Sequence, residues 1–387
     1  KDGASGAGMM KPPTMGGATA PVSVEGGGYA GGSLGKTPGL DAPLPAESFQ
    51  IPQEKRRLIR RRYLDLFGRG PTEAEVLAAA KQTDEQQVDA MLASVEFWRS
   101  WYEDELFYFL LIDQFRPTGE PLASMPERLA RGECTARDAL AEIVISQYFS
   151  ARNPGNDTFV TVVMEECLGL KVQDKANVKD LEGGKKMYDG YPASYLGEKG
   201  ASQSDVVKIT FAKKLFSEKY VERLYRRIMG AEISPEERAR AAEAFEKDAR
   251  SLPATVKSWI LSPVYASNAK YPRPKSDPQW VRTLYADLLG ARPDYKEFRD
   301  TRNALLALAD STPIRRVLGK VVIDSKKADR AAAVGSDPKR WIDERFLLLL
   351  GRLPTEKESA EFQAVLKEDG PRVILKALVQ SHDYQSY

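Results

Sequence analysis

Tyr63-Leu-Asp-Leu-Phe-Gly68-Arg-Gly-Pro71-Thr72-Glu-Ala-Glu75 is the stretch that decides the fold, because its pattern returns three times along the chain. Each copy has an aromatic residue five positions before a glycine, a helix-capping residue four positions after that glycine, and a glutamate three positions further on. Glycine tolerates the left-handed conformation that ends a helix. A Ser, Thr or Asp followed three residues later by Glu is the capping box that begins one. The pattern therefore predicts repeated helix-turn-helix units.

The cap residues of these units are the first site residues that the sequence predicts. They are Gly68, Thr72 and Glu75; Gly230, Ser234 and Glu237; Gly290, Asp294 and Glu297; and Gly351, Thr355 and Glu358. A serine three residues before an aromatic closes three of the units, at Ser94, Ser262 and Ser381, while Ser325 closes the third unit without an aromatic. Two closings without a clean start, at Ser146 and Ser217, indicate a diverged copy between residues 98 and 220.

Unit spacing and composition divide the chain into three parts. We expect a Gly/Pro-rich extended arm at 1–46; a helical domain at 47–270, with units at about 55–100 and 218–268 and a diverged insert at 116–210; and a C-terminal helical domain with two further units at 279–387. Segment 271–278 contains three prolines and is the expected boundary. The run 159–163 has β-propensity but no matching partner strand, so we interpret it as the start of a helix. The predicted fold class is all-α.

Composition excludes some classes of partner. Lys and Arg number 57 against 55 Asp and Glu in 387 residues, so no overall field attracts nucleic acid. No apolar run approaches the ~20 residues that span a bilayer. Peripheral or lipid-anchored association with a membrane stays open. Because the chain begins with Lys1, we expect an exported protein whose signal is already removed, located in the periplasm or at the cell surface.

The arm at 1–46 holds 12 of the 29 glycines and six prolines. Such a segment is expected to be disordered in isolation. Two interpretations of an ordered arm are open. It lies along a partner protein, with the partner supplying the contacts, or it packs on the chain's own helical body.

Two further segments are candidate contact surfaces. The basic helix at 54–67 carries six Lys and Arg residues, and a solvated face is favoured over a docking surface for an anionic partner. A loop expected at 182–205 carries Tyr188, Tyr191 and Tyr195. Long loops rich in Gly and Tyr often form contacts, although a plain surface excursion is slightly favoured for this sequence.

Catalytic constellations are scarce in the sequence. His382 is the single histidine and stands inside a closing motif, where a structural role is favoured. Cys134 and Cys167 are too few for a structural zinc site, and they form one disulfide or stay free according to the compartment. No haem-attachment motif and no phosphate-binding loop occurs. We therefore predict no cofactor and no metal.

A family resemblance rests on three stretches, 61–75, 92–98 and 221–230. They resemble helical domains of unknown function in secreted planctomycete and myxobacterial proteins and, more loosely, the helical units of phycobilisome linkers. The resemblance covers about half of the chain, in pieces. It implies a helical fold and, from the linkers, a role in holding other proteins in an assembly. The secreted relatives often adjoin cytochrome-like modules, whose haem motif this chain lacks, and no catalytic residue is carried over.

The function that the sequence favours is a non-enzymatic scaffolding subunit of an extracytoplasmic assembly. Its partners would be other protein subunits, contacted through the arm and the helical surfaces. Two alternatives remain open. One is a carbohydrate- or cell-wall-binding module that uses exposed tyrosines and tryptophans, and the other is a hydrolase that uses carboxylates only.

Overall fold

The computed structural model describes residues 32–35, 37–112, 115–268 and 270–387, and the fold is all-α, as the sequence predicts. The first unit and the helix after it comprise α1 (Gln53–Phe67), α2 (Glu73–Ala80), α3 (Asp84–Leu92) and α4 (Val95–Leu110). The second comprises α11 (Lys214–Met229), α12 (Pro235–Lys247), α13 (Leu252–Ile260) and α14 (Pro263–Asn268). The third comprises α15 (Asp277–Leu289), α16 (Tyr295–Leu305), α17 (Thr312–Asp324) and α18 (Asp329–Ala332), and the fourth comprises α19 (Pro338–Leu350), α20 (Glu356–Asp369), α21 (Pro371–Gln380) and α22 (His382–Gln385).

The insert adds further helices between the first two units. They are α5 (Met125–Ala130), α6 (Ala136–Ile145), α7 (Gln147–Arg152), α8 (Gly155–Val162), α9 (Val178–Tyr188) and α10 (Gln203–Phe211). The run 159–163 is helical, as expected, and continues into a π-helical turn, Val163–Cys167. A short antiparallel hairpin, β2 (Ala193–Tyr195) and β3 (Glu198–Gly200), precedes α10. The insert shares one hydrophobic core with the first two units.

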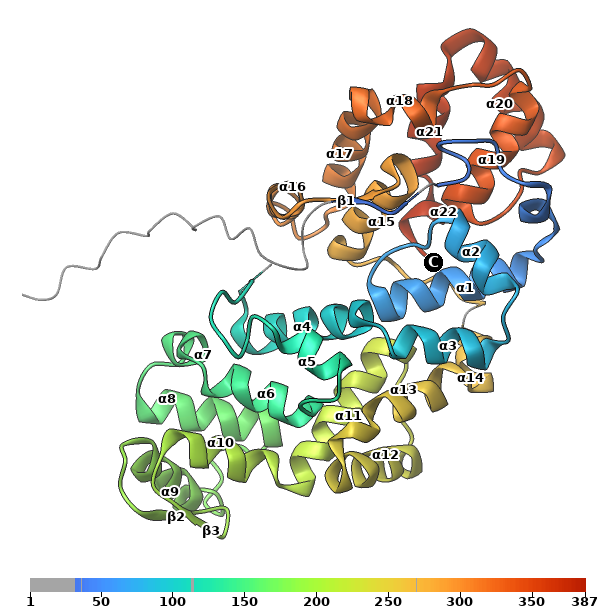
Figure 1. The fold of residues 1–387 in the computed structure, drawn as a ribbon. Helices are drawn as coiled ribbons and strands as arrows, with labels where there is room; N and C mark the ends of the chain where they lie inside the picture. Colours follow the sequence, from blue (N-terminus) through green and yellow to red (C-terminus); the bar gives the residue numbers. More distant parts are fainter. Residues whose placement is uncertain (1–31, 36, 113–114, 269) are drawn as a thin grey trace, which may run out of the picture.

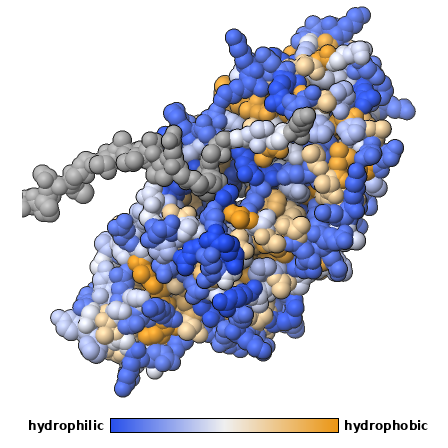
Figure 2. Space-filling model, in the orientation of Figure 1, coloured by the Kyte–Doolittle hydropathy of each residue, from blue (hydrophilic) through white to orange (hydrophobic). Residues whose placement is uncertain are grey.

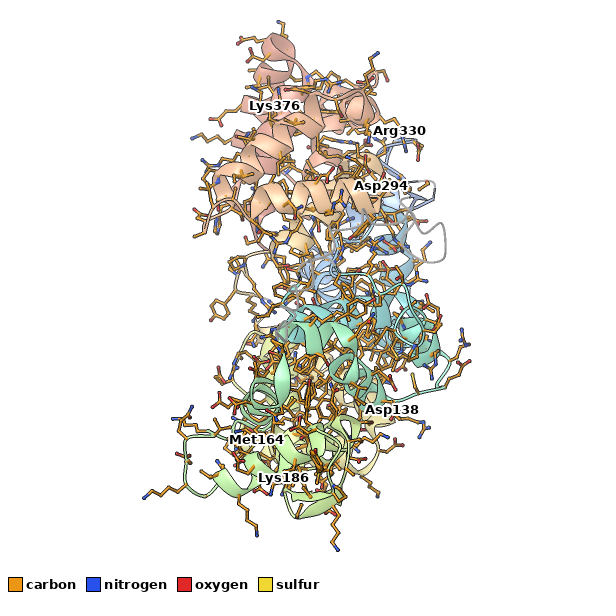
Figure 3. All side chains as sticks on the ribbon, turned by 90° about the vertical axis from the view of Figure 1, so that its left-hand side faces the viewer. Asp138, Met164, Lys186, Asp294, Arg330 and Lys376 are labelled. Carbon is orange, nitrogen blue, oxygen red and sulfur yellow. The ribbon has the colours of Figure 1, made fainter. Side chains whose placement is uncertain are left out.

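Two hydrophobic clusters form two lobes. The N-terminal lobe is built on residues between Ile59 and Tyr265, and the C-terminal lobe on residues between Trp280 and Tyr384 together with Leu40 from the arm. Figure 1 shows the lobes with α1 between them, and Figure 3 shows them from the side, where Asp138 and Lys186 lie in one lobe and Arg330 and Lys376 in the other. Within each lobe the third helices of its two units pack together, α3 on α13 and α17 on α21.

The turns of the repeat have the predicted mechanics. The four cap glycines end α1, α11, α15 and α19 in the left-handed conformation, with φ between +58° and +70°. Complete capping boxes begin α2, α16 and α20. At α12 only half of the box forms. The Ser234 hydroxyl accepts the Glu237 N–H, but the Glu237 carboxylate accepts from Trp259 and Arg240 instead.

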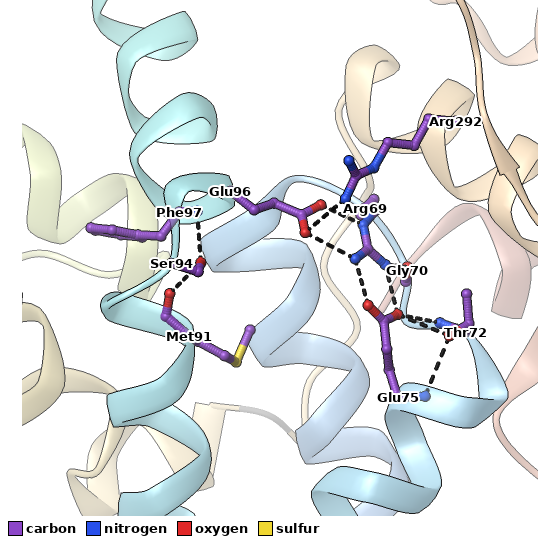
Figure 4. A network of polar contacts seen from close by, with 9 residues as sticks. All are labelled: Arg69, Gly70, Thr72, Glu75, Met91, Ser94, Glu96, Phe97 and Arg292. Carbon is purple, nitrogen blue, oxygen red and sulfur yellow. Dashed lines mark hydrogen bonds and ion pairs between the residues drawn. The ribbon is translucent and has the colours of Figure 1, made fainter. Parts of the chain in front are cut away.

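An arginine after the cap glycine joins the start of a unit to its end (Figure 4). Arg69 lies 2.6 Å from Glu75 of the capping box and 2.7 Å from Glu96, which follows the closing serine. Arg292 also binds Glu96, at 3.0 Å. In the fourth unit Arg352 bridges its capping-box glutamate and the aspartate after the closing serine in the same way. This arginine directly follows the cap glycine in the first and fourth copies, but its role becomes visible only in three dimensions.

The closing serines cap the helices that follow them. The Ser94, Ser262 and Ser381 hydroxyls each accept the N–H of the aromatic three residues later and donate to the carbonyl three residues earlier. Ser146 does the same at α7. The expected closing at Ser217 is wrong, because Ser217 lies inside α11, whose continuous hydrogen-bonding leaves no helix start there.

The described part of the arm packs on the chain's own C-terminal lobe. Strand β1 (Gly32–Ser33) pairs antiparallel with β4 (Ala291–Arg292). Leu44 is fully buried, and its N–H donates to Glu344 at 2.9 Å. For residues 32–46 the expectation of order imposed by a partner is therefore wrong, because the chain itself supplies the contacts. The part of the predicted arm at 1–31 lies outside the described residues.

Candidate functional site

The basic helix α1 is an internal element of the fold. Arg56, Arg61 and Arg62 are each only 2% exposed. Arg56 pairs with Glu73 at 2.6 Å, and Arg62 donates to Asp84 at 2.8 Å. The expected solvated face and the alternative docking surface are both wrong for these residues, because neighbouring carboxylates compensate the guanidinium charges inside the molecule.

Asp65 on α1 gathers four side chains at the junction between the lobes. The Tyr265 and Tyr387 hydroxyls donate to it at 2.8 and 2.7 Å. The guanidiniums of Arg61 and Arg273 lie 3.5 and 3.3 Å away. Burial raises the pKa of Asp65, while the two guanidiniums and the two hydroxyls offset part of this shift. The Asp65 carboxylate thereby connects α1 to the end of the second unit and to the last residue of the chain.

Asp287 occupies the equivalent position on α15. Arg60 crosses from α1 to bind it at 3.0 Å and also donates to the Leu348 carbonyl at 2.9 Å. The Tyr384 hydroxyl lies beside Asp287, although without the geometry of an ordinary hydrogen bond. Burial raises the pKa of Asp287 and lowers that of nearby Lys275, whose ammonium donates to backbone carbonyls. This second cluster fastens α1 to the C-terminal lobe.

The two clusters reveal an alternation among the four units. Asp65 and Asp287 both stand three residues before the cap glycine, in the first and third units. Their tyrosines, Tyr265 and Tyr384, both stand three residues after the closing serine, in the second and fourth units. The repeat is thus built of pairs, in which one unit supplies the carboxylate and the next supplies the phenol. The shared Tyr-x-Asp-x-x-Gly in two of the four copies was the sequence signal for it.

A pocket of about 260 Å³ opens between the lobes. Its walls come from α4, from the segment before α5, and from α15 and α16: Glu103, Asp104, Phe107, Phe115, Arg116, Ser276, Asp277, Pro278, Arg282, Phe298 and Arg302. Arg282 pairs with Glu103 across the lobes, and its guanidinium stacks 4.6 Å from the Phe298 ring. Phe107 is 47% exposed. The pocket therefore combines aromatic walls with charges that already pair with one another.

The other predicted site residues do not converge. The segment expected as a loop at 182–205 is the end of α9, the β2–β3 hairpin and the start of α10, and Gly183 and Gly184 pack closely inside α9. Tyr188 packs on Phe159, and Tyr195 is fully buried with its hydroxyl 3.0 Å from that of Thr210. Tyr191 alone is exposed, at 65%, so the predicted three-tyrosine contact surface is wrong.

Of the two states left open for the cysteines, the structure has free thiols and no disulfide. Cys134 and Cys167 are free and buried in separate places, Cys134 beside Met125 before α6 and Cys167 in the π-helical turn. Burial raises the pKa of both thiols, which lowers their reactivity.

Within the described ranges, no group of three or more His, Cys, Asp or Glu side chains is arranged to hold a metal ion. Across those ranges, every helix is too short or too polar to cross a membrane. Neither protein-family models nor curated proteins give a match to this chain.

Proposed function

We propose that this protein is a non-catalytic structural subunit that holds other proteins in an assembly outside the cytoplasm. The junction supports this role. Arg60, Asp65 and Asp287 tie both lobes to one helix through buried ion pairs, which favours a body that keeps its shape when partners bind. The periplasmic or cell-surface location remains a proposal from the sequence, as do contacts through residues 1–31.

The observation that carries the proposal is a set of exposed apolar side chains in and before α17 on the C-terminal lobe. Leu306, Leu308, Val317 and Val321 follow one another through the α16–α17 connection and along α17, and each is half exposed or more. Val317 and Val321 are one helical turn apart and therefore share a face. The face in Figure 2 carries mostly hydrophilic side chains with apolar ones scattered among them. Clustered apolar side chains at a surface are typical of sites where another protein binds.

The residues required by the other functional hypotheses are occupied in the fold. All five tryptophans are buried, and Tyr191 is the exposed member of the predicted tyrosine set, so the residues proposed for stacking on a glycan give that alternative less support. The buried carboxylates Asp65 and Asp287 are bound by arginines and face tyrosines. They act as structural ion pairs in this arrangement.

The proposal is tested by isolating the full tagged chain from the native cell envelope under mild conditions. Wild type is compared with a Val317→Asp, Val321→Asp double variant and with Val264→Asp, which places the same charge at an exposed valine on α14. We expect a defined set of partner proteins to co-purify with wild type and with Val264→Asp, and these proteins to be absent from the double-variant sample. Recovery of the wild type alone, at the monomer mass of 43.0 kDa, would contradict a scaffolding role.

A further inference from the structure

Helix α17 presents to solvent a face that its own lobe leaves uncovered. Val317 and Val321 are each 61% exposed, which is the highest value among the described Val, Leu and Ile residues. Arg316 and Lys320 precede them by one residue each and are also exposed. Residues four apart on a helix are neighbours, so the valines form one row and the two cations form a second row beside it. The face is therefore partly apolar and partly basic.

Side chains on the opposite side of α17 hold this face in a fixed direction. Arg315 pairs with Asp277 at 2.5 Å. Gly319 packs on α21 so closely that an added Cβ would lie 3.0 Å from the Val379 side chain. Ile323 is fully buried. Because α17 is already ordered by these contacts, a partner that binds its outer face does not have to supply the free energy of ordering it.

The two cations of this face have no partner of their own in the part of the chain that the structure describes. There, neither Arg316 nor Lys320 forms a salt bridge or a side-chain hydrogen bond. The carboxylates closest to them in sequence are already engaged, because Asp324 pairs with Lys376 at 2.6 Å and Asp310 accepts a backbone N–H at 2.9 Å. The face therefore suits a partner that brings negative charge.

A second amphipathic helix fits this arrangement. Its own apolar residues at positions i and i+4 would pack against Val317 and Val321, as the ridges of one helix pack into the grooves of another. Asp or Glu in the adjoining row would meet Arg316 and Lys320. A membrane surface fits less well, because helices that lie on bilayers carry Trp, Phe or Leu on their apolar face, and the apolar row here has two valines.

We propose that α17 docks an acidic amphipathic helix of a partner protein, with Val317 and Val321 as the apolar contacts and Arg316 and Lys320 as the counter-charges. The inference rests on the proposed scaffolding function and gives the partner a chemical identity. Removing the valines from water supplies affinity. The two cations select an acidic partner and fix its register along α17.

Crosslinking from this face identifies its occupant. Val321 is replaced by the photo-crosslinker p-benzoylphenylalanine in the full tagged chain, the native envelope is illuminated, and the crosslinked peptide is sequenced by mass spectrometry. We expect a partner segment with apolar residues at i and i+4 and with at least two Asp or Glu residues in the adjoining positions. A crosslinked segment without acidic residues would overturn the inference, as would partner proteins that co-purify without any crosslink, and both results leave the scaffolding function standing. If no protein co-purifies with the wild type, the scaffolding function fails and the inference with it.

Charge reversal tests the two cations separately from the valines. Arg316→Glu with Lys320→Glu is compared with Lys357→Glu with Lys367→Glu on α20, which makes the same charge change at two exposed lysines. We expect the first pair of substitutions to lower the crosslink yield at least tenfold and the second pair to leave it at the wild-type level. Equal yields in the two double variants would overturn the proposal.

A synthetic copy of the crosslinked segment completes the test. With its Asp and Glu residues replaced by Lys, the peptide should bind the charge-reversed chain at least tenfold more tightly than the wild type, as measured by fluorescence anisotropy. Binding that does not follow the exchange of charge would argue against the counter-charges. Co-sedimentation of the wild type with phosphatidylglycerol vesicles that is lost in Arg316→Glu with Lys320→Glu would assign the face to a membrane and overturn the proposal.

Discussion

Replacing Asp65 by Asn removes the charge at the centre of the junction while keeping the size of the side chain. Asp65 accepts hydroxyl hydrogen bonds from Tyr265 and Tyr387, each worth about 1.5–3 kcal/mol to a charged acceptor. Asn has one acceptor oxygen, so at least one of the two bonds is lost. Arg61, with a side chain only 3% exposed, would keep its bond to the Asn268 carbonyl but lose its counter-charge. We expect the free energy of unfolding to fall by about 3–5 kcal/mol, as for other broken buried pairs.

Urea unfolding at neutral pH, followed by far-UV circular dichroism and by tryptophan fluorescence, measures this loss. The matched control is Asp104→Asn, which breaks an ion pair with Arg227 where the aspartate side chain is 54% exposed. An exposed pair contributes about 0.2–1 kcal/mol. If Asp65→Asn costs no more than Asp104→Asn, the buried Asp65 cluster does not hold the junction.

Three further predictions follow from other parts of the fold. Gly290→Ala should lower the free energy of unfolding by about 1–2 kcal/mol more than Gly132→Ala, as measured by thermal denaturation. Both glycines have positive φ, but a Cβ at Gly290 would lie 2.7 Å from the Thr37 hydroxyl of the arm, whereas Gly132 faces open space. Hydrogen bonds from Arg352 lower the pKa of Glu358 to about 2, so the pair stabilises the folded state above the unfolded pKa of Glu and loses this effect as pH falls from about 4.5 to 2. In Glu358→Gln the free energy of unfolding should therefore fall by about 1 kcal/mol less than in wild type over this pH range, a small value because the pair is partly exposed. An unchanged acid-unfolding profile would argue against the pair. Both cysteines should resist alkylation in the native protein and react fully in denaturant without any reductant, as measured by mass; a chain that needs reductant first would contain the disulfide after all.

The local mechanics of the repeat could be predicted because they depend on neighbours in sequence. Gly68, Thr72 and Glu75 lie within eight consecutive residues, and so their spacing alone defines the two caps. Gly132, Thr135 and Asp138 form the same arrangement in the insert. That copy was missed as a start because its glycine stands three residues before the cap instead of four, and its capping acid is Asp.

The long-range partners could not be predicted in this way. A charge pattern such as that of Arg60 and Arg62 looks solvated when the helix is considered alone, since the carboxylates that pair with these two residues are far away in sequence. The compensating groups Asp84 and Asp287 are 22 and 227 residues away from their arginines. The tyrosines of 182–205 were misassigned for a similar reason, because burial of Tyr195 depends on packing against α10 and not on its glycine-rich surroundings.

The pairing of carboxylate-bearing with phenol-bearing units constrains how such a chain can change length during evolution. Deleting or duplicating one unit would leave a buried aspartate or tyrosine without its hydrogen-bond partner, and such a group lowers the free energy of unfolding. Gene rearrangements that add or remove two units at once would keep each aspartate together with its tyrosine. Lineages that carry this architecture should therefore differ by even numbers of units, and shortened versions made in the laboratory should be cut between pairs.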